Sequence, residues 1–252
     1  MATCAIVTGA GSGIGAAVAR RLDADGHAVV LVGRRREPLE EIAGELSAAE
    51  VVTADVGEAA DCERAVAAAA ARFGGIDVLV NNAGVADADW ERTLRVNLTG
   101  AHLMAQAALP HLLERRGAIV NVASINAVLA GPGWTPYCVS KAGLVMLTRC
   151  LATDHGPAGL RANAVCPGWV RTPMGDADMA EVGRLHGTDV EGAYALVHRG
   201  HPLGRAAEPE EVAAAVAFLA GPDASYVNGV TLPADGGASI YDPTSAAFAD
   251  PA

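Results

Sequence analysis

Short apolar segments alternate with longer segments of helical character from one end of this chain to the other. The apolar segments are continuous runs, which is typical of strands in a parallel sheet that is covered on both faces. Strands and helices that alternate in this way, without a Pro-, Gly- or Ser-rich linker, predict a single doubly wound α/β domain over residues 1–252. The expected seven strands of the parallel sheet are 3–8, 28–33, 50–54, 77–81, 118–123, 161–166 and 229–232. The expected helices, which would cover both faces, are 14–25, 38–47, 59–73, 91–115, 135–155 and 209–220.

Two segments depart from this alternation. Residues 169–208 contain Gly, Pro, Asp and His without a regular period, and such a long excursion in a compact domain is usually a lid or a binding loop. We therefore predict a substrate loop over 169–208. Residues 240–252 form a polar, Pro-containing tail, which we expect to be disordered unless it packs on a neighbouring subunit.

The composition narrows the classes of partner. A formal net charge of −11 argues against nucleic acid or an anionic membrane as the main partner. The first strand begins without a charged and then apolar leader, and the apolar run 212–220 is far too short to span a bilayer. The five cysteines are odd in number and have no Cys-x-x-Cys spacing, and no His-Glu-x-x-His pattern occurs. We expect a reduced, cytoplasmic protein without a metal site.

Glycines cluster directly after the first expected strand, where the first expected helix begins. Glycine lets the backbone turn tightly and approach a pyrophosphate, which the free N–H groups and the dipole of a helix N-terminus stabilise. In this strand–loop–helix context, the cluster predicts the dinucleotide site of a Rossmann-type domain. The segment is Thr8-Gly9-Ala10-Gly11-Ser12-Gly13-Ile14-Gly15, in which Gly9, Gly13 and Gly15 form the expected functional set, with Ser12 and Ile14 between them.

Three arginines, 34–36, follow the second expected strand. A domain of this type that selects NAD usually carries an acidic residue here to bind the ribose 2′-hydroxyl, and this chain has Gly33 instead. Arginines just before a helix oppose its dipole unless an anion lies among them, and a 2′-phosphate is such an anion. NADP(H) is therefore the favoured cofactor, with Arg34 and Arg35 as contacts. Alternatively, the arginines only pair with nearby Glu37, Glu40 and Glu41, and NAD(H) is then possible.

A tyrosine and a lysine four residues apart form a candidate proton-transfer device. Tyr137 and Lys141 would share one face of the helix expected over 135–155. A fixed ammonium group nearby lowers the pKa of a phenol from about 10 toward the working range of an acid–base catalyst. Ser124 follows the strand expected over 118–123, so its hydroxyl can bind a carbonyl or alcohol oxygen near Tyr137. Such a pair is common in helices, so the other motifs must supply the context.

Taken together, these motifs resemble the short-chain dehydrogenase/reductase family in its compact form. Their order and approximate spacing match over nearly the whole chain. The resemblance rests on Thr-Gly-x-x-x-Gly-Ile-Gly at 8–15, Asp55-Val56, Asn81-Asn82-Ala83-Gly84, Asn97, Ser124, Tyr137 with Lys141, and Pro167-Gly168.

The resemblance implies a role for each matching position. Tyr137 would be the general acid/base, and Lys141 would lower its pKa and hold the nicotinamide ribose. Ser124 would polarise the substrate carbonyl, and Asn97 would organise a water in the proton relay. The other cofactor contacts would be Asp55 and Val56 at the adenine, Asn81, Ala83 and Gly84 along the groove, and Pro167, Gly168, Val170 and Thr172 at the nicotinamide. The resemblance also implies a homotetramer, or a homodimer, with segments 98–115 and 135–155 at one interface.

The predicted activity is that of an oxidoreductase that interconverts a small-molecule ketone and a secondary alcohol by hydride transfer with NADP(H). An NAD-dependent dehydrogenase of a hydroxy compound is the alternative within the same class. A dinucleotide-sensing module without turnover is an alternative from another class. The complete set of Asn97, Ser124, Tyr137 and Lys141 argues against the sensor, because a sensor has no need of a proton relay.

The segment 85–96 is shorter than the corresponding loop in the family, where it covers the substrate side of the cleft. We therefore expect a more open pocket on that side. Residues 169–208 would then carry more of the substrate contacts. The apolar candidates in that region are Trp169, Met174, Met179, Leu185, Tyr194 and Leu196.

Overall fold

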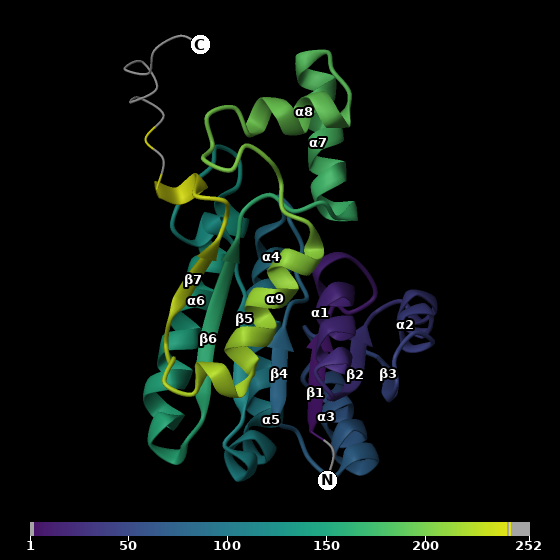
Figure 1. Cartoon of the computed structure of the whole chain (residues 1–252). Helices are drawn as coiled ribbons and strands as arrows, with labels where there is room; N and C mark the ends of the chain where they lie inside the picture. Colours follow the sequence, from purple (N-terminus) through teal and green to yellow (C-terminus); the bar gives the residue numbers. More distant parts are fainter. Residues whose placement is uncertain (1–2, 241, 243–252) are drawn as a thin grey trace.

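The strands of the protein form a parallel sheet in the order β3-β2-β1-β4-β5-β6-β7 (Figure 1). The structure is a computed structural model, which describes residues 3–240 and 242. The predicted doubly wound, Rossmann-type architecture is confirmed, because helices cover both faces of this sheet. The strands are β1 Cys4–Thr8, β2 Ala28–Gly33, β3 Ala49–Thr53, β4 Val78–Asn81, β5 Ala118–Val122, β6 Arg161–Pro167 and β7 Thr231–Ala234.

Successive residues of β1 show how the two faces are built. Ala5 and Val7 point into one apolar cluster, whereas Cys4 and Ile6 point into the other, as the period of two of a strand requires. All four side chains are fully buried, which explains the continuous apolar run in the sequence. The first face packs against α1 Gly13–Ala24, α2 Arg36–Ala43 and α9 Pro209–Ala220. The second face packs against α3 Ala59–Phe73, α5 Gly100–Arg115 and α6 Thr135–His155.

The helix expected over 91–115 is interrupted. A short helix, α4 Trp90–Leu94, leads into a π-helical turn at Arg95–Thr99, and α5 follows at Gly100. Such single π-helical turns often occur at functional sites. Here the turn carries Asn97, whose side chain is almost completely buried.

The region 169–208 is a correction to the sequence prediction, because it contains two helices instead of an irregular loop. They are α7 Pro173–His186 and α8 Val190–Val197, and Figure 1 shows them beyond the carboxyl ends of the strands. Each has a side-chain N-cap: the Thr172 hydroxyl accepts from the Gly175 N–H (3.0 Å), and Asp189 accepts from the Gly192 N–H (2.8 Å). The Thr172-Pro173 pair, a cap followed by proline at the first helical position, was the signal that could have predicted α7.

Two further sequence expectations concern the membrane and the chain end. None of the helices among the described residues is both long and apolar enough to cross a bilayer. The predicted tail 240–252 lies outside the described residues except at Ile240 and Asp242.

Candidate active site

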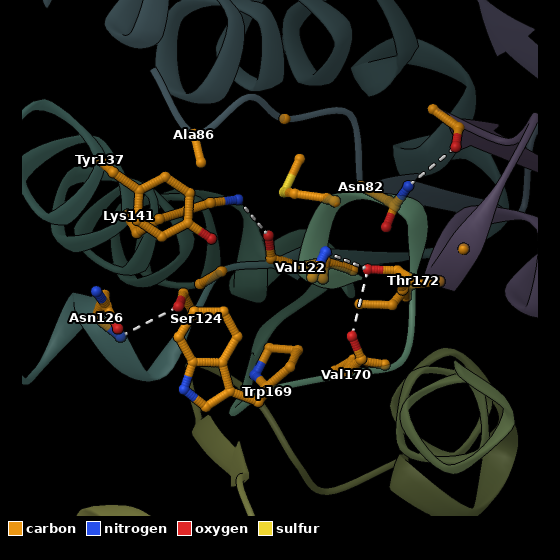
Figure 2. A pocket seen from close by; sticks show the side chains of 18 of the residues that line it. Asn82, Ala86, Val122, Ser124, Asn126, Tyr137, Lys141, Trp169, Val170 and Thr172 are labelled. Atoms are coloured by element: carbon orange, nitrogen blue, oxygen red, sulfur yellow. Dashed lines mark hydrogen bonds between the residues drawn. The ribbon is translucent and has the colours of Figure 1, made fainter. Parts of the chain in front are cut away.

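The loops at the carboxyl edge of the sheet enclose a cavity of about 300 Å³. It lies beside the ends of β1 and β4, where the strand order reverses, which is where open α/β sheets bind ligands. Figure 2 shows Tyr137, Lys141 and Ser124 at one end of this cavity and Asn82 and Thr172 at the other. The predicted site residues that line it are Gly9, Ser12, Gly13, Ile14, Gly15, Ala83, Gly84, Ser124, Tyr137, Lys141, Pro167, Gly168, Val170 and Thr172.

The glycine loop after β1 has the conformation that a pyrophosphate requires. Gly9 and Gly13 have φ values of +66° and +53°, in the left-handed region where side chains are strained. A Cβ atom at Gly15 would lie 2.2 Å from the Gly9 carbonyl oxygen, so only glycine fits there. The N-cap residue Ser12 makes no side-chain capping bond, and the first turn of α1 contains no acidic residue. The N–H groups and the positive end of the dipole of α1 are therefore available to an anion, and the loop fits a dinucleotide.

The three arginines after β2 differ in their contacts. Arg36 pairs with Glu40 at 2.9 Å. This is the contact expected of all three arginines if they only pair with nearby glutamates. Arg34 and Arg35 are exposed, and within residues 3–240 the side chain of neither forms a hydrogen bond or an ion pair. Neither arginine lines the cavity. Both precede Pro38, near the start of α2, and a Cβ at Gly11 would lie only 3.1 Å from Pro38. The arginines therefore lie near the glycine loop.

Asp55 and Val56 also lie outside the cavity lining. The Asp55 carboxylate accepts the Gly57 N–H at 2.8 Å, which makes it a turn residue, and lies 3.7 Å from Arg95. Val56 is buried and faces Gly100, where a Cβ would lie 2.8 Å from its side chain. The structure therefore gives Asp55 and Val56 structural contacts at the carboxyl end of β3.

The proposed proton-transfer residues come from β5 and α6. Ser124 lies two residues after the end of β5 and accepts a hydrogen bond from the Asn126 N–H at 3.1 Å, which fixes its oxygen at the cavity wall. Lys141 is buried on the second turn of α6, and its Nζ donates to the Val122 carbonyl oxygen at 2.9 Å. The same Nζ lies 5.7 Å from the centroid of the Tyr137 ring. The i, i+4 spacing and the end of β5 thus bring all three side chains to one place, as predicted.

The pKa of Tyr137 differs from the sequence prediction. Burial raises the pKa of the Tyr137 phenol to about 12; the Ser124 hydroxyl opposes this increase, and the negative charge of Asp178 adds to it. Burial also lowers the pKa of Lys141 to about 8. The expected lowering of the Tyr137 pKa by Lys141 is not found: Lys141 is not among the causes of this shift, and its amino group bonds to the Val122 carbonyl.

The buried lysine makes a testable contribution to stability. Because the pKa of Lys141 falls from 10.5 in the unfolded chain to about 8 in the folded one, the unfolded chain binds more protons between these values. Stability therefore rises with pH in this window, whereas below about pH 8 both states are protonated and the full cost of burial is present. Relative to Lys141→Met, we expect the wild type to gain about 2 to 3 kcal/mol between pH 7 and pH 10. Urea unfolding of both proteins at the two pH values measures this gain, and a difference that is independent of pH would contradict it.

Asn97 lies behind the cavity wall, where it joins two segments. Its side chain accepts the Val85 N–H at 2.8 Å and donates to the Val85 carbonyl at 2.9 Å. It also donates to the Ser140 hydroxyl at 3.0 Å, on the helix that carries Tyr137 and Lys141. A Cβ at Gly84 would lie 3.4 Å from both Asn97 Oδ1 and Lys141 Nζ, so the two polar groups border the same glycine. Asn97 therefore ties the loop after β4 to α6.

Two neighbouring asparagines, Asn81 and Asn82, lie at the carboxyl end of β4, and the one that lines the cavity is Asn82, which was not predicted. Asn81 points into the core, where its amide donates to Asn121 Oδ1 at 2.9 Å. Asn82 lines the cavity and donates to the Thr8 and Gly9 carbonyls at 2.9 and 3.3 Å. The alternation of a strand was the available signal, because it sends adjacent side chains to opposite sides.

Other cavity residues were also missed by the sequence analysis. They are brought in mostly by loops and by α7, and no spacing along the chain marks them. Met179 and Tyr194, predicted as substrate contacts, instead pack in a small core between α7 and α8. Leu185 and Leu196 also lie outside the cavity, whereas Trp169 and Met174 line it. The missed lining residues include Asn82, Ala86, Ile125, Asn126, Trp134 and Asp178.

The chain has close relatives of known class. Residues 9–239 match a family model described as enoyl-(acyl carrier protein) reductase. The chain is 41% identical over 248 residues to meso-2,3-butanediol dehydrogenase of Serratia marcescens, a match that covers 94% of each protein. It is also similar to the crystal structure of levodione reductase, with 34% identity, a TM-score of 0.90, and coverage of 95% of this chain and 98% of that one. For a variant of actinorhodin polyketide ketoreductase with NADPH, the identity is 36%, the TM-score 0.89, and the coverage 95% and 98%.

The fold, the glycine loop and these relatives define the class of the protein as an NAD(P)-dependent oxidoreductase. Within this class, the chain belongs to the short-chain dehydrogenase/reductase family.

Proposed function

We propose that the protein interconverts a ketone and a secondary alcohol, with NADP(H) as the cofactor and Tyr137 as the general acid/base. The observation that carries this proposal is the meeting of Ser124, Tyr137 and Lys141 at one end of a cavity whose other end is the glycine loop. Relatives named as a dehydrogenase of a diol and as ketone reductases support the reaction class.

The side chains at the Tyr137 end can hold and transfer a proton. Because its pKa is raised to about 12, the Tyr137 phenol is protonated at neutral pH, which is the form that donates to a carbonyl oxygen during reduction. The Ser124 hydroxyl, held by the Asn126 N–H, would donate a hydrogen bond to the same oxygen and orient the substrate. A Lys141 ammonium group would stabilise the negative charge that remains on the phenol after the transfer.

The remaining predicted residues would hold the dinucleotide. The loop with Gly9, Gly13 and Gly15 would bind the pyrophosphate, and Lys141 would bind the nicotinamide ribose. When bound, the nicotinamide cofactor supplies or accepts a hydride. Pro167, Gly168, Val170 and Thr172 line the same cavity as the glycine loop and Ser124, which supports their place beside the nicotinamide.

The free guanidinium groups at β2 make the choice of cofactor testable. We expect Arg34→Gln and Arg35→Gln each to raise the Kd for NADPH at least tenfold, about 1.4 kcal/mol, because each would lose a charge-assisted bond to the 2′-phosphate. The Kd for NADH should change less than twofold. Calorimetric titration with both cofactors measures this.

Arg36→Gln is the matched control, because Arg36 already pairs with Glu40 and its loss should leave both Kd values unchanged. Equal binding of NADPH and NADH by the wild type would contradict the proposed 2′-phosphate site. It would favour the NAD-dependent oxidation of a hydroxy compound.

The proposal also includes a single domain, a homotetramer and a cytoplasmic location. A sheet that contains both the first and the last strand supports the single domain. Val139 and Met146 are exposed on α6, the helix for which the family resemblance implies an interface. All five cysteines are free, which supports a reducing compartment.

A further inference from the structure

One carboxylate in the active-site cavity has no partner among the described residues. Asp178, on the second turn of α7, lines the cavity and is half-buried, and its carboxylate forms neither a hydrogen bond nor an ion pair with the part of the chain that the structure describes. Its burial raises its own pKa, and no nearby cation opposes that increase. A half-buried carboxylate without a partner is costly, so its place in a binding cavity indicates a ligand group that compensates it.

The two charged residues that line this cavity do not pair with each other. Lys141 is the only basic side chain among the residues that line it, and its amino group already donates to the Val122 carbonyl. Asp178 is the only acidic one. Asp178 and Tyr137 line the same cavity, and the negative charge of Asp178 raises the pKa of the Tyr137 phenol.

Aromatic rings surround the same end of the cavity. The rings of Trp134 and Tyr137 lie 5.6 Å apart and those of Trp134 and Trp169 lie 6.0 Å apart, in both cases edge to face. All three residues line the cavity, and Figure 2 shows the Trp169 ring close to Ser124. Aromatic faces attract cations, and the Asp178 carboxylate in the same cavity lining adds a full opposite charge. Together they form the kind of site that binds an ammonium group.

We propose that Asp178, with Trp134 and Trp169, selects substrates that carry a positively charged nitrogen near the reacting carbonyl or hydroxyl group. This inference rests on the proposed oxidoreductase function and adds a substrate class to it. A cation in this place would compensate the charge of the half-buried Asp178 carboxylate. It would also remove the repulsion that opposes a negative charge on the Tyr137 oxygen, so it would favour both binding and proton transfer.

A matched set of three methyl ketones tests the inference. The first carries a trimethylammonium group three carbons from the carbonyl, the second a neutral tert-butyl group of the same shape, and the third a hydroxyl group. The wild type with NADPH should reduce the cationic ketone with a kcat/KM at least tenfold above that of the neutral one, and Asp178→Asn should reduce this ratio to below two. Asp176→Asn is the control, because Asp176 lies on the same helix but bonds to the Tyr194 hydroxyl outside the cavity.

Calorimetric titration of the same three compounds into the NADPH complex gives a readout that does not depend on turnover. Tighter binding of the cationic ketone that is lost in Asp178→Asn and kept in Asp176→Asn supports the inference, even if none of the ketones is reduced. Equal affinity for the cationic and neutral ketones, or a preference for the hydroxyl compound, overturns it. Reduction of the neutral ketone in that case leaves the proposed function intact.

Discussion

Replacement of Tyr137 by phenylalanine is expected to lower kcat by about three orders of magnitude and to leave the affinity for NADPH within about twofold. The loss follows from the removal of a positioned proton donor, which contributes about 10²- to 10⁴-fold to a rate. Phenylalanine keeps the ring that contacts Trp134 at 5.6 Å, so the cavity wall is preserved. Steady-state kinetics and calorimetric titration with NADPH measure the two quantities on the same protein.

Tyr226→Phe is the control for this substitution. Tyr226 is fully exposed, so loss of its hydroxyl should change neither kcat nor cofactor affinity. If Tyr137→Phe keeps more than a tenth of the wild-type kcat, another group donates the proton and the assigned role of Tyr137 is wrong. If it loses cofactor affinity and activity together, Tyr137 acts in binding instead.

A methyl group at position 15 is expected to cost about 3 kcal/mol of unfolding free energy or more, and to weaken NADPH binding by more than tenfold. A Cβ atom there would lie 2.2 Å from the Gly9 carbonyl oxygen and 2.5 Å from the amide nitrogen of Asn82. The first of these atoms belongs to the backbone and cannot rotate away, so Gly15→Ala must displace the glycine loop itself. Urea unfolding and NADPH titration measure both effects.

Gly44→Ala is the matched control. Gly44 is an exposed residue after α2, has a helical φ of −64°, and a Cβ there would meet only ordinary contacts at 3.5 Å. Its substitution should leave stability within about 0.5 kcal/mol of the wild type or raise it slightly. If Gly15→Ala keeps the stability and the cofactor affinity of the wild type, the loop is less closely packed than the structure shows.

The sheet was predictable because its strands carry their own signal. Both faces are buried, so each strand is a continuous apolar run, and helix-length segments separate these runs. The π-helical turn at Arg95–Thr99 was not predictable, because the contacts of Asn97 with Val85 and Ser140 hold it. Helix α7 was missed because Gly175 and Gly183, which are unfavourable in a helix, lie within it. The N-cap at Thr172 was nevertheless recognisable in the sequence.

The site was predictable where its residues are close in sequence. The glycine loop is a single segment, and Tyr137 and Lys141 are one helical turn apart, so local geometry alone brings their groups together. The pKa of Tyr137 was not predictable, because it depends on burial by elements far apart in the chain. The same holds for Asp178, which lines the cavity because α7 lies beyond the carboxyl edge of the sheet.

The most direct test of the proposed reaction is the transfer of a label. The wild-type protein is incubated with a panel of ketones and with NADPH that carries deuterium at the transferable position of the nicotinamide, on either face in separate reactions. Mass spectrometry of the products should find deuterium on the carbinol carbon of at least one alcohol, from one face only, and Tyr137→Phe should form almost none. The absence of deuterium from every product, with NADH as well as with NADPH, would contradict the proposal that this protein reduces ketones.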